Sequence, residues 1–200
     1  MAKVQKRGLI LVLAGLLLVA VALGMHLMQK KQDALAGQTA QMLLQQLELN
    51  RLVIHQESNE SPVDETPAVM PEKEYMDYRM LGSVQVSSVG VKLPVLSSWD
   101  EQMLKIAPCR YSGSIPEQNM IIMGHNYKSH FTPLHQVNVG DEVIFEDVAG
   151  IIYRYRVATI ETLHRSQGEL LPSDYPLTLF TCTPGGINRL VIRCETAGKQ

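Results

Sequence analysis

One apolar run in the sequence ends on a cysteine and is followed closely by an arginine. The run Leu177–Thr181 has the composition of a β-strand, Cys182 stands at its end, and Pro184 stops the strand from continuing. Arg189 begins the next apolar run after a Gly185-Gly186 turn. Two antiparallel strands joined by so short a loop bring Cys182 and Arg189 close together.

An arginine beside a cysteine supports nucleophilic chemistry in two ways. Its fixed positive charge favours the thiolate form of the cysteine. Its planar set of N–H donors also binds the oxyanion that forms when a thiolate attacks a carbonyl. Arg193 lies on the same face of the predicted strand, roughly 13 Å beyond Arg189 at the rise of a β-strand. We therefore interpret Arg193 as a structural or supporting residue.

A cysteine nucleophile that cleaves an amide also needs a general acid, and histidine is the usual one. The candidates in the predicted folded region are His125, His130, His135 and His164. His125 follows the apolar run Met120–Gly124, so it is presented at a strand end behind a glycine that permits close backbone approach. His130 and His135 fall in a predicted loop and short helix. We therefore predict that His125 is the partner of the cysteine.

The composition excludes several other kinds of site. The net charge of −2 gives no basic field for nucleic acid. The three cysteines have no zinc-ligand spacing, and we interpret Cys109 and Cys194 as small buried hydrophobic residues. Scattered acids such as Asp141 and Glu142 are typical of a solvated rim rather than a calcium site. We expect no metal and no cofactor.

The N-terminal region predicts a membrane anchor in residues 1–28. Residues 8–28 are apolar and uncharged, which is about the length that spans a bilayer. Three basic residues precede this run and favour a cytoplasmic N-terminus with the rest of the chain outside. A cleaved signal peptide is the alternative, but charged residues surround its only candidate cleavage site, Ala34–Ala36.

The sequence predicts two further regions after the anchor. Residues 29–75 are interpreted as a stalk, helical to about Gln56, and a flexible linker that is acidic and contains three prolines. Whether the stalk helix pairs with a second copy is left open. Residues 76–200 are expected to form the catalytic domain.

The catalytic domain is expected to be mainly β. Short apolar runs separated by turn residues recur along it, with a hairpin predicted at Ser87–Gly90 and a turn at Gly150. A helix is predicted from Ser97 to the residues before Pro108. Many short strands with one or two small helices are typical of a closed or nearly closed β-barrel, which leaves no exposed strand edge.

Three segments resemble the signature segments of the sortases. They are Gly-His-Asn at His125, Thr-Leu-Phe-Thr-Cys-Thr-Pro around Cys182, and Asn-Arg-Leu-Val-Ile-Arg from Asn188. The similarity runs from about Leu81 to Glu195. It implies an eight-stranded barrel and a cell-wall transpeptidase of Gram-positive bacteria. It also implies that His125 is the general acid and base, Cys182 the nucleophile, and Arg189 the residue that positions substrate and binds the oxyanion.

The resemblance also implies substrates and partners. The thiolate would attack the Thr carbonyl of an LPxTG-like sorting signal on a surface protein, and an amine such as a peptidoglycan cross-bridge or a pilin lysine would resolve the thioester. We assign Asn126, Thr181, Leu170 and Leu171 to substrate binding. The two leucines would form an apolar wall of the groove, or alternatively a loop packed on the barrel.

Several sequence features bear on the sortase subclass and on two competing functions. We see no second hydrophobic segment after Cys194 and no Asp-Pro-aromatic motif before the barrel, which disfavours a pilin-polymerising sortase, and we assign class D. A membrane-anchored cell-wall cysteine hydrolase is the alternative enzyme, although such hydrolases generally place the cysteine before the histidine. A non-enzymatic adhesin explains the anchor but not the meeting of cysteine, arginine and histidine.

Overall fold

The computed structural model describes residues 2–57 and 69–197, with side-chain burial for residues 13–50 and 69–197. The chain forms two compact units, Met1–Leu35 and Ala36–Gln200. A single helix, α1 (Ala2–Glu57), begins in the first unit and ends in the second. The catalytic residues predicted from the sequence all lie in the second unit.

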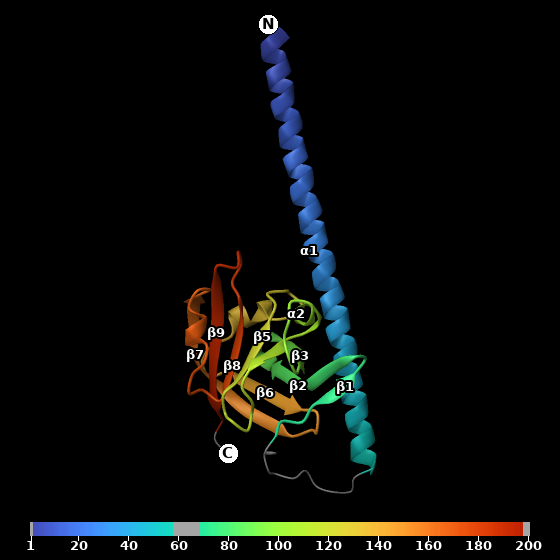
Figure 1. The fold of residues 1–200 in the computed structure, drawn as a ribbon, viewed down its shortest axis with the longest axis vertical. Coiled ribbons are helices and arrows are strands. Elements are labelled where there is room, and N and C mark those ends of the chain that lie inside the picture. The colour runs from blue at the N-terminus through green and yellow to red at the C-terminus, as the bar shows by residue number, and fades with distance from the viewer. Residues whose placement is uncertain (1, 58–68, 198–200) are drawn as a thin grey trace. The chain divides into compact units, whose positions relative to one another are not determined.

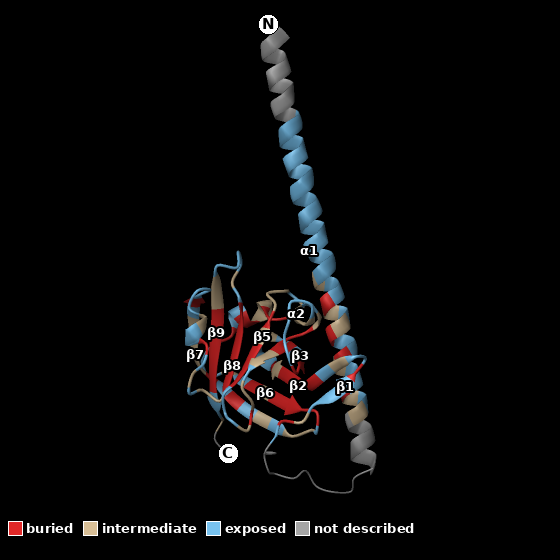
Figure 2. Cartoon of the chain, viewed as in Figure 1, coloured by how far each residue is buried: buried red, intermediate tan, exposed pale blue. Residues whose placement is uncertain are grey.

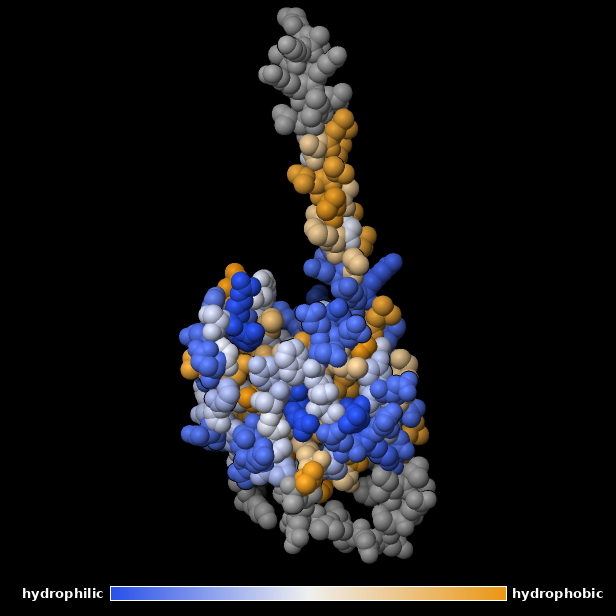
Figure 3. Space-filling model, in the orientation of Figure 1, coloured by the Kyte–Doolittle hydropathy of each residue, from blue (hydrophilic) through white to orange (hydrophobic). Residues whose placement is uncertain are grey.

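The first part of α1 is exposed and apolar. Side chains from Leu13 to Met28 are all exposed, and Figure 3 shows apolar residues along this part of the helix. Among the described residues, the helical segment Leu13–Asn50 is long and apolar enough to cross a membrane, a test that an N-terminal signal sequence also passes. One N-terminal helix therefore fits a single-pass membrane anchor, as predicted for residues 8–28.

The second unit consists mostly of short strands (Figure 1). The strands are β1 (Lys73–Tyr75), β2 (Tyr78–Val86), β3 (Val91–Leu96), β4 (Cys109–Ser112), β5 (Met120–Gly124), β6 (Glu142–Asp147), β7 (Ile152–His164), β8 (Leu177–Cys182) and β9 (Asn188–Thr196). Its other elements are the second part of α1, the helix α2 (Met103–Ile106) and the 3-10 helices η1 (Ser87–Val89), η2 (Thr132–Gln136) and η3 (Gly168–Leu170).

The strands close into a barrel. Within the described residues they form one sheet in the order β1-β2-β3-β4-β5-β8-β9-β7-β6, and an additional pairing of β2 with β6 joins the ends. The closed ring therefore contains the eight strands β2 to β9, with β1 added outside it. Closure pairs the strand edges that an open sheet would expose. The predicted mainly β fold, a closed eight-stranded barrel with short helices and an N-terminal helix, is confirmed.

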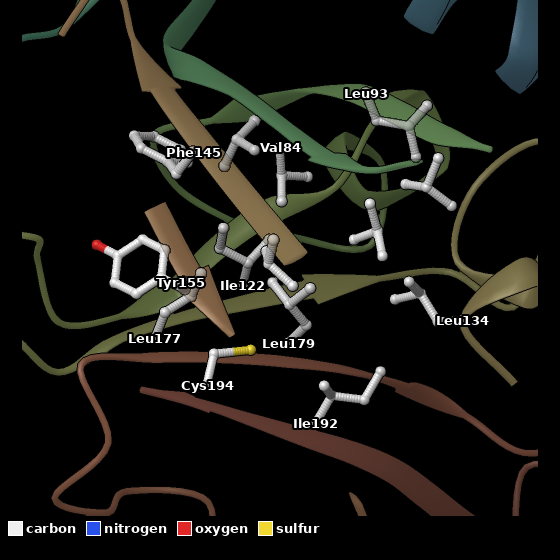
Figure 4. Packing of buried hydrophobic residues seen from close by; sticks show 14 of the residues in the cluster. Val84, Leu93, Ile122, Leu134, Phe145, Tyr155, Leu177, Leu179, Ile192 and Cys194 are labelled. Carbon is white, nitrogen blue, oxygen red and sulfur yellow. The ribbon is translucent and has the colours of Figure 1, made fainter. Parts of the chain in front are cut away.

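The barrel is filled by alternate residues of its strands. Successive side chains of a strand point to opposite faces, so every second residue turns inward. Val84 is the register partner of Phe145, Leu179 is the partner of Ile192, and all four are at most 1% exposed. Figure 4 shows these side chains packed together with Cys194, and Figure 2 shows the buried positions along the strands. This rigid core fixes where each strand ends.

Of the hairpin and the helix predicted early in the catalytic domain, one is confirmed and the other is wrong in extent. The hairpin at Ser87–Gly90 is confirmed, because β2 and β3 pair on either side of η1 and Gly90 adopts a left-handed conformation with φ of 68°. The helix predicted from Ser97 is wrong in extent, because α2 covers only Met103–Ile106. The N–H of Ser97 donates instead to the carbonyl of Arg79, which keeps this residue in extended chain beside β2.

The second part of α1 packs on the barrel within the Ala36–Gln200 unit. Its buried residues share one face of the helix and are at most 4% exposed: Ala36, Ala40, Leu43 and Leu47. Leu43 and Leu47 belong to a buried cluster that includes Met80 of β2 and Leu96 of β3. Beside this cluster, Lys92 Nζ donates to Glu48 Oε1 at 2.5 Å.

This packing concerns the predicted boundary at residue 76 between the stalk and linker and the catalytic domain. The compact unit begins at Ala36, and β1 begins at Lys73, so folded structure is present on the N-terminal side of Met76. The predicted stalk is helical through Glu57. Most of the predicted linker, residues 58–68, lies outside the described residues.

Candidate active site

Cys182 and Arg189 face each other across two neighbouring strands. Strands β8 and β9 pair antiparallel, and the last register pair of their ladder is Cys182 with Arg189. The connecting turn is closed by the N–H of Thr183, which donates to the carbonyl of Asn188 at 2.9 Å. Gly185 and Gly186 in this turn have φ of 87° and 71°, which is the left-handed region that glycine enters without steric cost. The predicted pairing of cysteine and arginine is therefore confirmed.

His125 reaches the same edge of the barrel from the other side of β8. Strands β5 and β8 run parallel, and Gly124 is the register partner of Thr181. His125 and Cys182 are the residues that follow these partners, so they leave the ladder side by side. Neighbouring strands lie about 4.8 Å apart, which sets the scale of the separation between the two backbones. Three adjacent strands thus present a histidine, a cysteine and an arginine at one edge.

The loop after His125 folds back and holds the histidine. The N–H of Phe131 donates to the carbonyl of His125 at 3.1 Å. The ring of Phe131 covers Gly124 so closely that a Cβ at position 124 would lie 2.3 Å from Phe131 Cδ2. The imidazole of His125 stacks on the Tyr127 ring, with centroids 4.5 Å apart and planes inclined by 22°. Glycine is therefore required at position 124, and the orientation of the imidazole is restricted by an aromatic neighbour.

The environment of His125 favours its neutral form. The side chain is half-buried, and loss of solvation lowers its pKa below the ordinary value of 6.5. The positive charge of Lys105 lowers the pKa further, whereas the negative charge of Glu101 raises it. A neutral imidazole can accept a proton from a neighbouring thiol and return it later to a leaving group.

Cys182 differs from the other two cysteines in exposure. Cys109 and Cys194 are both fully buried, and burial raises the pKa of each thiol to about 12. Cys182 is exposed at the end of β8. A solvent-accessible thiol beside a guanidinium is the arrangement expected of a nucleophile, whereas buried protonated thiols are inert. The interpretation of Cys109 and Cys194 as buried hydrophobic residues is confirmed.

A cleft of about 480 Å³ opens beside the histidine and the arginine. Its lining residues come from the segment before β4, from strands β4, β5, β8 and β9, from the residue after β5, and from the β7–β8 connection: Trp99, Glu101, Leu104, Lys105, Tyr111, Met123, His125, Gly168, Leu171, Phe180 and Arg189. Trp99 stacks on Tyr111 with centroids 5.5 Å apart, and Tyr111 meets Phe180 edge to face at 5.3 Å. The cleft therefore has a largely apolar, aromatic wall with charged groups at its reactive end.

Arg189 is held by the loop between β7 and β8. Its Nη1 donates to the backbone carbonyl of Arg165 at 2.7 Å. One arm of the guanidinium is thereby fixed, and Arg189 is only half-buried, so its remaining donors are accessible from the cleft that it lines. An arginine fixed in this way is ready to bind negative charge that develops at Cys182.

The residues predicted to bind substrate fall into two groups. Leu171 is 2% exposed and lines the cleft, whereas Leu170 is 47% exposed and is absent from the described residues that line it. Asn126 accepts a hydrogen bond from Thr132 Oγ1 at 2.8 Å and so contributes to the loop after His125. Thr181 is 1% exposed and lies in the β8 ladder beneath the site.

Sequence reasoning missed the aromatic wall. Trp99 falls within the helix predicted from Ser97, and that prediction gives no binding role to the single tryptophan of the chain. Tyr111 was not singled out, and its contact with Phe180 depends on strand order. A single tryptophan in a segment that also carries charged residues is the sequence signal that could have indicated a binding surface.

Metal-ligating side chains do not cluster in the part of the chain that the structure describes. Among the described residues, no group of three or more His, Cys, Asp or Glu side chains is arranged to hold a metal ion.

Several solved structures share this fold. The sortase C1 of Streptococcus suis matches with a TM-score of 0.54 and 24% identity over 60% of this chain and 74% of that chain. A Clostridium perfringens sortase D5 transpeptidase matches with a TM-score of 0.54 and 19% identity over 60% of this chain and 79% of that chain. The sortase C2 of Group B Streptococcus pilus island 1 matches with a TM-score of 0.54 and 20% identity, covering 62% and 76%. At these identities the likeness concerns the fold.

A comparison with curated proteins found no match. The family model described as "Sortase domain" matches residues 84–197, which is more than half of the chain and includes His125, Cys182 and Arg189. Because the family model, the closed barrel and the strand-end cysteine agree, the chain belongs to the sortase family of cysteine transpeptidases.

Proposed function

We propose that this sortase cleaves an LPxTG-like sorting signal of a surface protein and transfers that protein to an amine of the cell wall. The observation that carries the proposal is the convergence of Cys182, Arg189 and His125 at one barrel edge beside an apolar cleft. In this proposal Cys182 is the nucleophile, His125 the general acid and base, and Arg189 the oxyanion-binding residue.

The first half of the reaction forms a thioester. His125, neutral because its pKa is lowered, accepts the Cys182 proton as the sulfur attacks the Thr carbonyl carbon. The carbonyl oxygen becomes an oxyanion, which the free donors of Arg189 stabilise. When the tetrahedral intermediate collapses, the C–N bond breaks and His125 donates its proton to the departing amine.

The second half transfers the acyl group. A neutral primary amine attacks the thioester carbonyl, and His125 now accepts a proton from that amine. The oxyanion forms again beside Arg189, the C–S bond breaks, and His125 returns its proton to the Cys182 sulfur, which restores the starting thiol and the neutral imidazole. Water competes with the amine, so an apolar cleft wall that excludes water favours transfer over hydrolysis.

The lining of the cleft supports a peptide with apolar side chains as substrate. The aromatic wall of Trp99, Tyr111 and Phe180 suits apolar side chains and a proline ring. Leu171 adds aliphatic surface from the β7–β8 loop. We keep Leu170, Asn126 and Thr181 as proposed substrate-binding residues, with Leu170 the exposed member of the group.

The proposed location follows from the N-terminal region. We propose that α1 crosses the cell membrane once, with the basic N-terminus in the cytoplasm and the catalytic barrel outside, where surface proteins and cell-wall amines are found. The proposed class is D, and the amine acceptor is then a peptidoglycan cross-bridge rather than a pilin lysine.

A peptide assay tests the proposal. The full chain in detergent micelles is incubated with LPxTG-like peptides, with and without diaminopimelate, oligoglycine or a lysine-containing pilin peptide. Mass spectrometry follows the free acid and each amine adduct. An adduct with a cell-wall amine, lost in Cys182→Ala, supports the proposal. Free acid alone, unchanged by any amine, indicates a hydrolase, and an adduct only with the pilin peptide indicates a pilin-polymerising enzyme.

A further inference from the structure

Arg193 of β9 is a buried cation whose hydrogen bonds point to one loop. Its side chain is 3% exposed, which is unusual for an arginine and requires that its donors be satisfied. It lies four positions after Arg189, so both side chains leave the same face of β9. The catalytic scheme assigns no task to Arg193.

Most of the partners of Arg193 belong to the connection between β7 and β8. Its Nη2 donates to the carbonyl of Leu170 at 2.5 Å, and its Nη1 donates to the carbonyl of Leu171. The same Nη1 lies 3.1 Å from Ser173 Oγ and 3.4 Å from Thr178 Oγ1. The guanidinium therefore binds two consecutive carbonyls of the loop and one of its hydroxyls.

The charge of Arg193 is balanced from the opposite side. Its Nε donates to Glu161 Oε1 of β7 at 3.2 Å. Glu161 is 38% exposed, so this carboxylate also remains in contact with solvent. An arginine can serve all these partners because it presents five N–H donors in a rigid plane, whereas a lysine offers one ammonium group.

The two arginines of β9 hold two different parts of the same loop. Arg189 donates to the carbonyl of Arg165, near the end of β7, and Arg193 holds residues 170–173 before β8. Gly168, between these anchors, and Leu171, within the second one, line the cleft. The position of this cleft wall therefore depends on hydrogen bonds from β9.

We propose that Arg193 is a positioning residue that fixes the β7–β8 loop, residues 165–176, and thereby sets which apolar side chain of the peptide the cleft accepts. The proposal rests on the sortase reaction described above. Arg193 acts through the Leu170 and Leu171 backbone, and so through the wall formed by Leu171, without touching the reacting atoms. Its loss should affect peptide binding and selectivity more than the chemical step.

The test compares three variants of the full chain in detergent micelles. Arg193→Met removes the donors and keeps an apolar stem. Arg193→Lys keeps the positive charge but loses the planar guanidinium. If Arg193→Met does not fold, Arg193→Lys still tests the role of the guanidinium. Arg154→Met is the matched control, because Arg154 lies on β7 and makes an exposed ion pair with Glu142.

Two measurements are made on each variant. Hydrogen–deuterium exchange reports the opening of residues 165–176, with β5 as an internal reference for global folding. Peptide kinetics report kcat and KM for LPxTG and for a peptide whose Leu is replaced by Ser. We expect loop exchange to rise about 10-fold, KM for LPxTG to rise about 10-fold, and kcat to change by less than about 3-fold.

The selectivity between the two peptides should fall by about 10-fold in Arg193→Met, fall less in Arg193→Lys, and stay unchanged in Arg154→Met. Unchanged loop exchange, or a loss confined to kcat with selectivity intact, overturns the proposal. If the wild type cleaves neither peptide, the proposed function fails, and the exchange measurement still decides whether Arg193 holds the loop.

Discussion

Cys182 and Arg189 are the last register partners of the antiparallel β8–β9 ladder. Their pairing places a guanidinium beside the exposed thiol without any contribution from a flexible segment. The parallel pairing of β5 with β8 adds His125 to the other side of Cys182. The site is therefore assembled from three neighbouring strand ends, and the rigid barrel core fixes its geometry.

The difference in exposure among the cysteines predicts a single reactive thiol. In the folded protein, iodoacetamide should modify Cys182 at least about 100-fold faster than Cys109 or Cys194, because only thiolate that is accessible reacts. Intact-mass spectrometry should show one adduct, which Cys182→Ala abolishes. Cys109→Ser is the control and should still give one adduct, and equal labelling of all three thiols would contradict the assignment.

The planar set of N–H donors of Arg189 should contribute to kcat/KM in addition to the positive charge. Arg189→Ala should lower kcat/KM by about 100- to 1,000-fold, since an oxyanion donor is lost. Arg189→Lys should recover only part of this loss, because a single ammonium cannot hold the Arg165 carbonyl and the oxyanion together. Steady-state peptide kinetics measure both effects. Arg165→Gln is the matched control, because it changes an exposed side chain and keeps the backbone carbonyl.

The charges near His125 predict opposite shifts of its pKa. Lys105→Gln removes a cation that lowers the pKa, so the pKa of His125 should rise. Glu101→Gln removes an anion that raises it, so the pKa should fall further below 6.5. An NMR titration of the imidazole proton measures both, and the acidic limb of the pH–rate profile should move in the same directions. Shifts of the same sign in both variants would refute the electrostatic account.

The buried face of α1 predicts a contribution of the stalk to stability. Leu43 and Leu47 are at most 1% exposed, so changing either to alanine should lower the free energy of unfolding by about 2–5 kcal/mol. Leu49 is 57% exposed on the same helix, and Leu49→Ala should have little effect. Thermal unfolding of the three variants in micelles makes the comparison. Equal melting temperatures would show that this helix does not stabilise the barrel.

Some of the site followed from local sequence. The run ending at Cys182, the two glycines and the restart at Arg189 form one short hairpin, so their spacing predicts the register. His125 was placed at a strand end, but its position next to Cys182 depends on a parallel pairing of strands that are far apart in the chain. The pattern of apolar residues in one strand does not indicate which distant strand pairs with it.

Other features depended on tertiary packing. The apolar spacing of Leu43 and Leu47 was visible, yet the pattern alone does not say whether a stalk helix packs on a barrel or on a second copy. The spacing of Arg193 from Arg189 predicts a supporting residue, but it does not indicate that its side chain binds the β7–β8 loop. Arg193 binds the backbone carbonyls of Leu170 and Leu171. Every residue has a backbone carbonyl, so the residue types in the sequence do not reveal these hydrogen bonds.

The central claim is that Cys182 carries the acyl group between peptide and amine. The most direct measurement is to incubate the full chain in micelles with an LPxTG-like peptide, quench with acid, digest, and sequence the acylated fragment by mass spectrometry. The account predicts a thioester on Cys182 that accumulates without amine and disappears when diaminopimelate or oligoglycine is added, with an equal gain of amide product. Acylation at another residue, or a Cys182 thioester that reacts only with water, would contradict it.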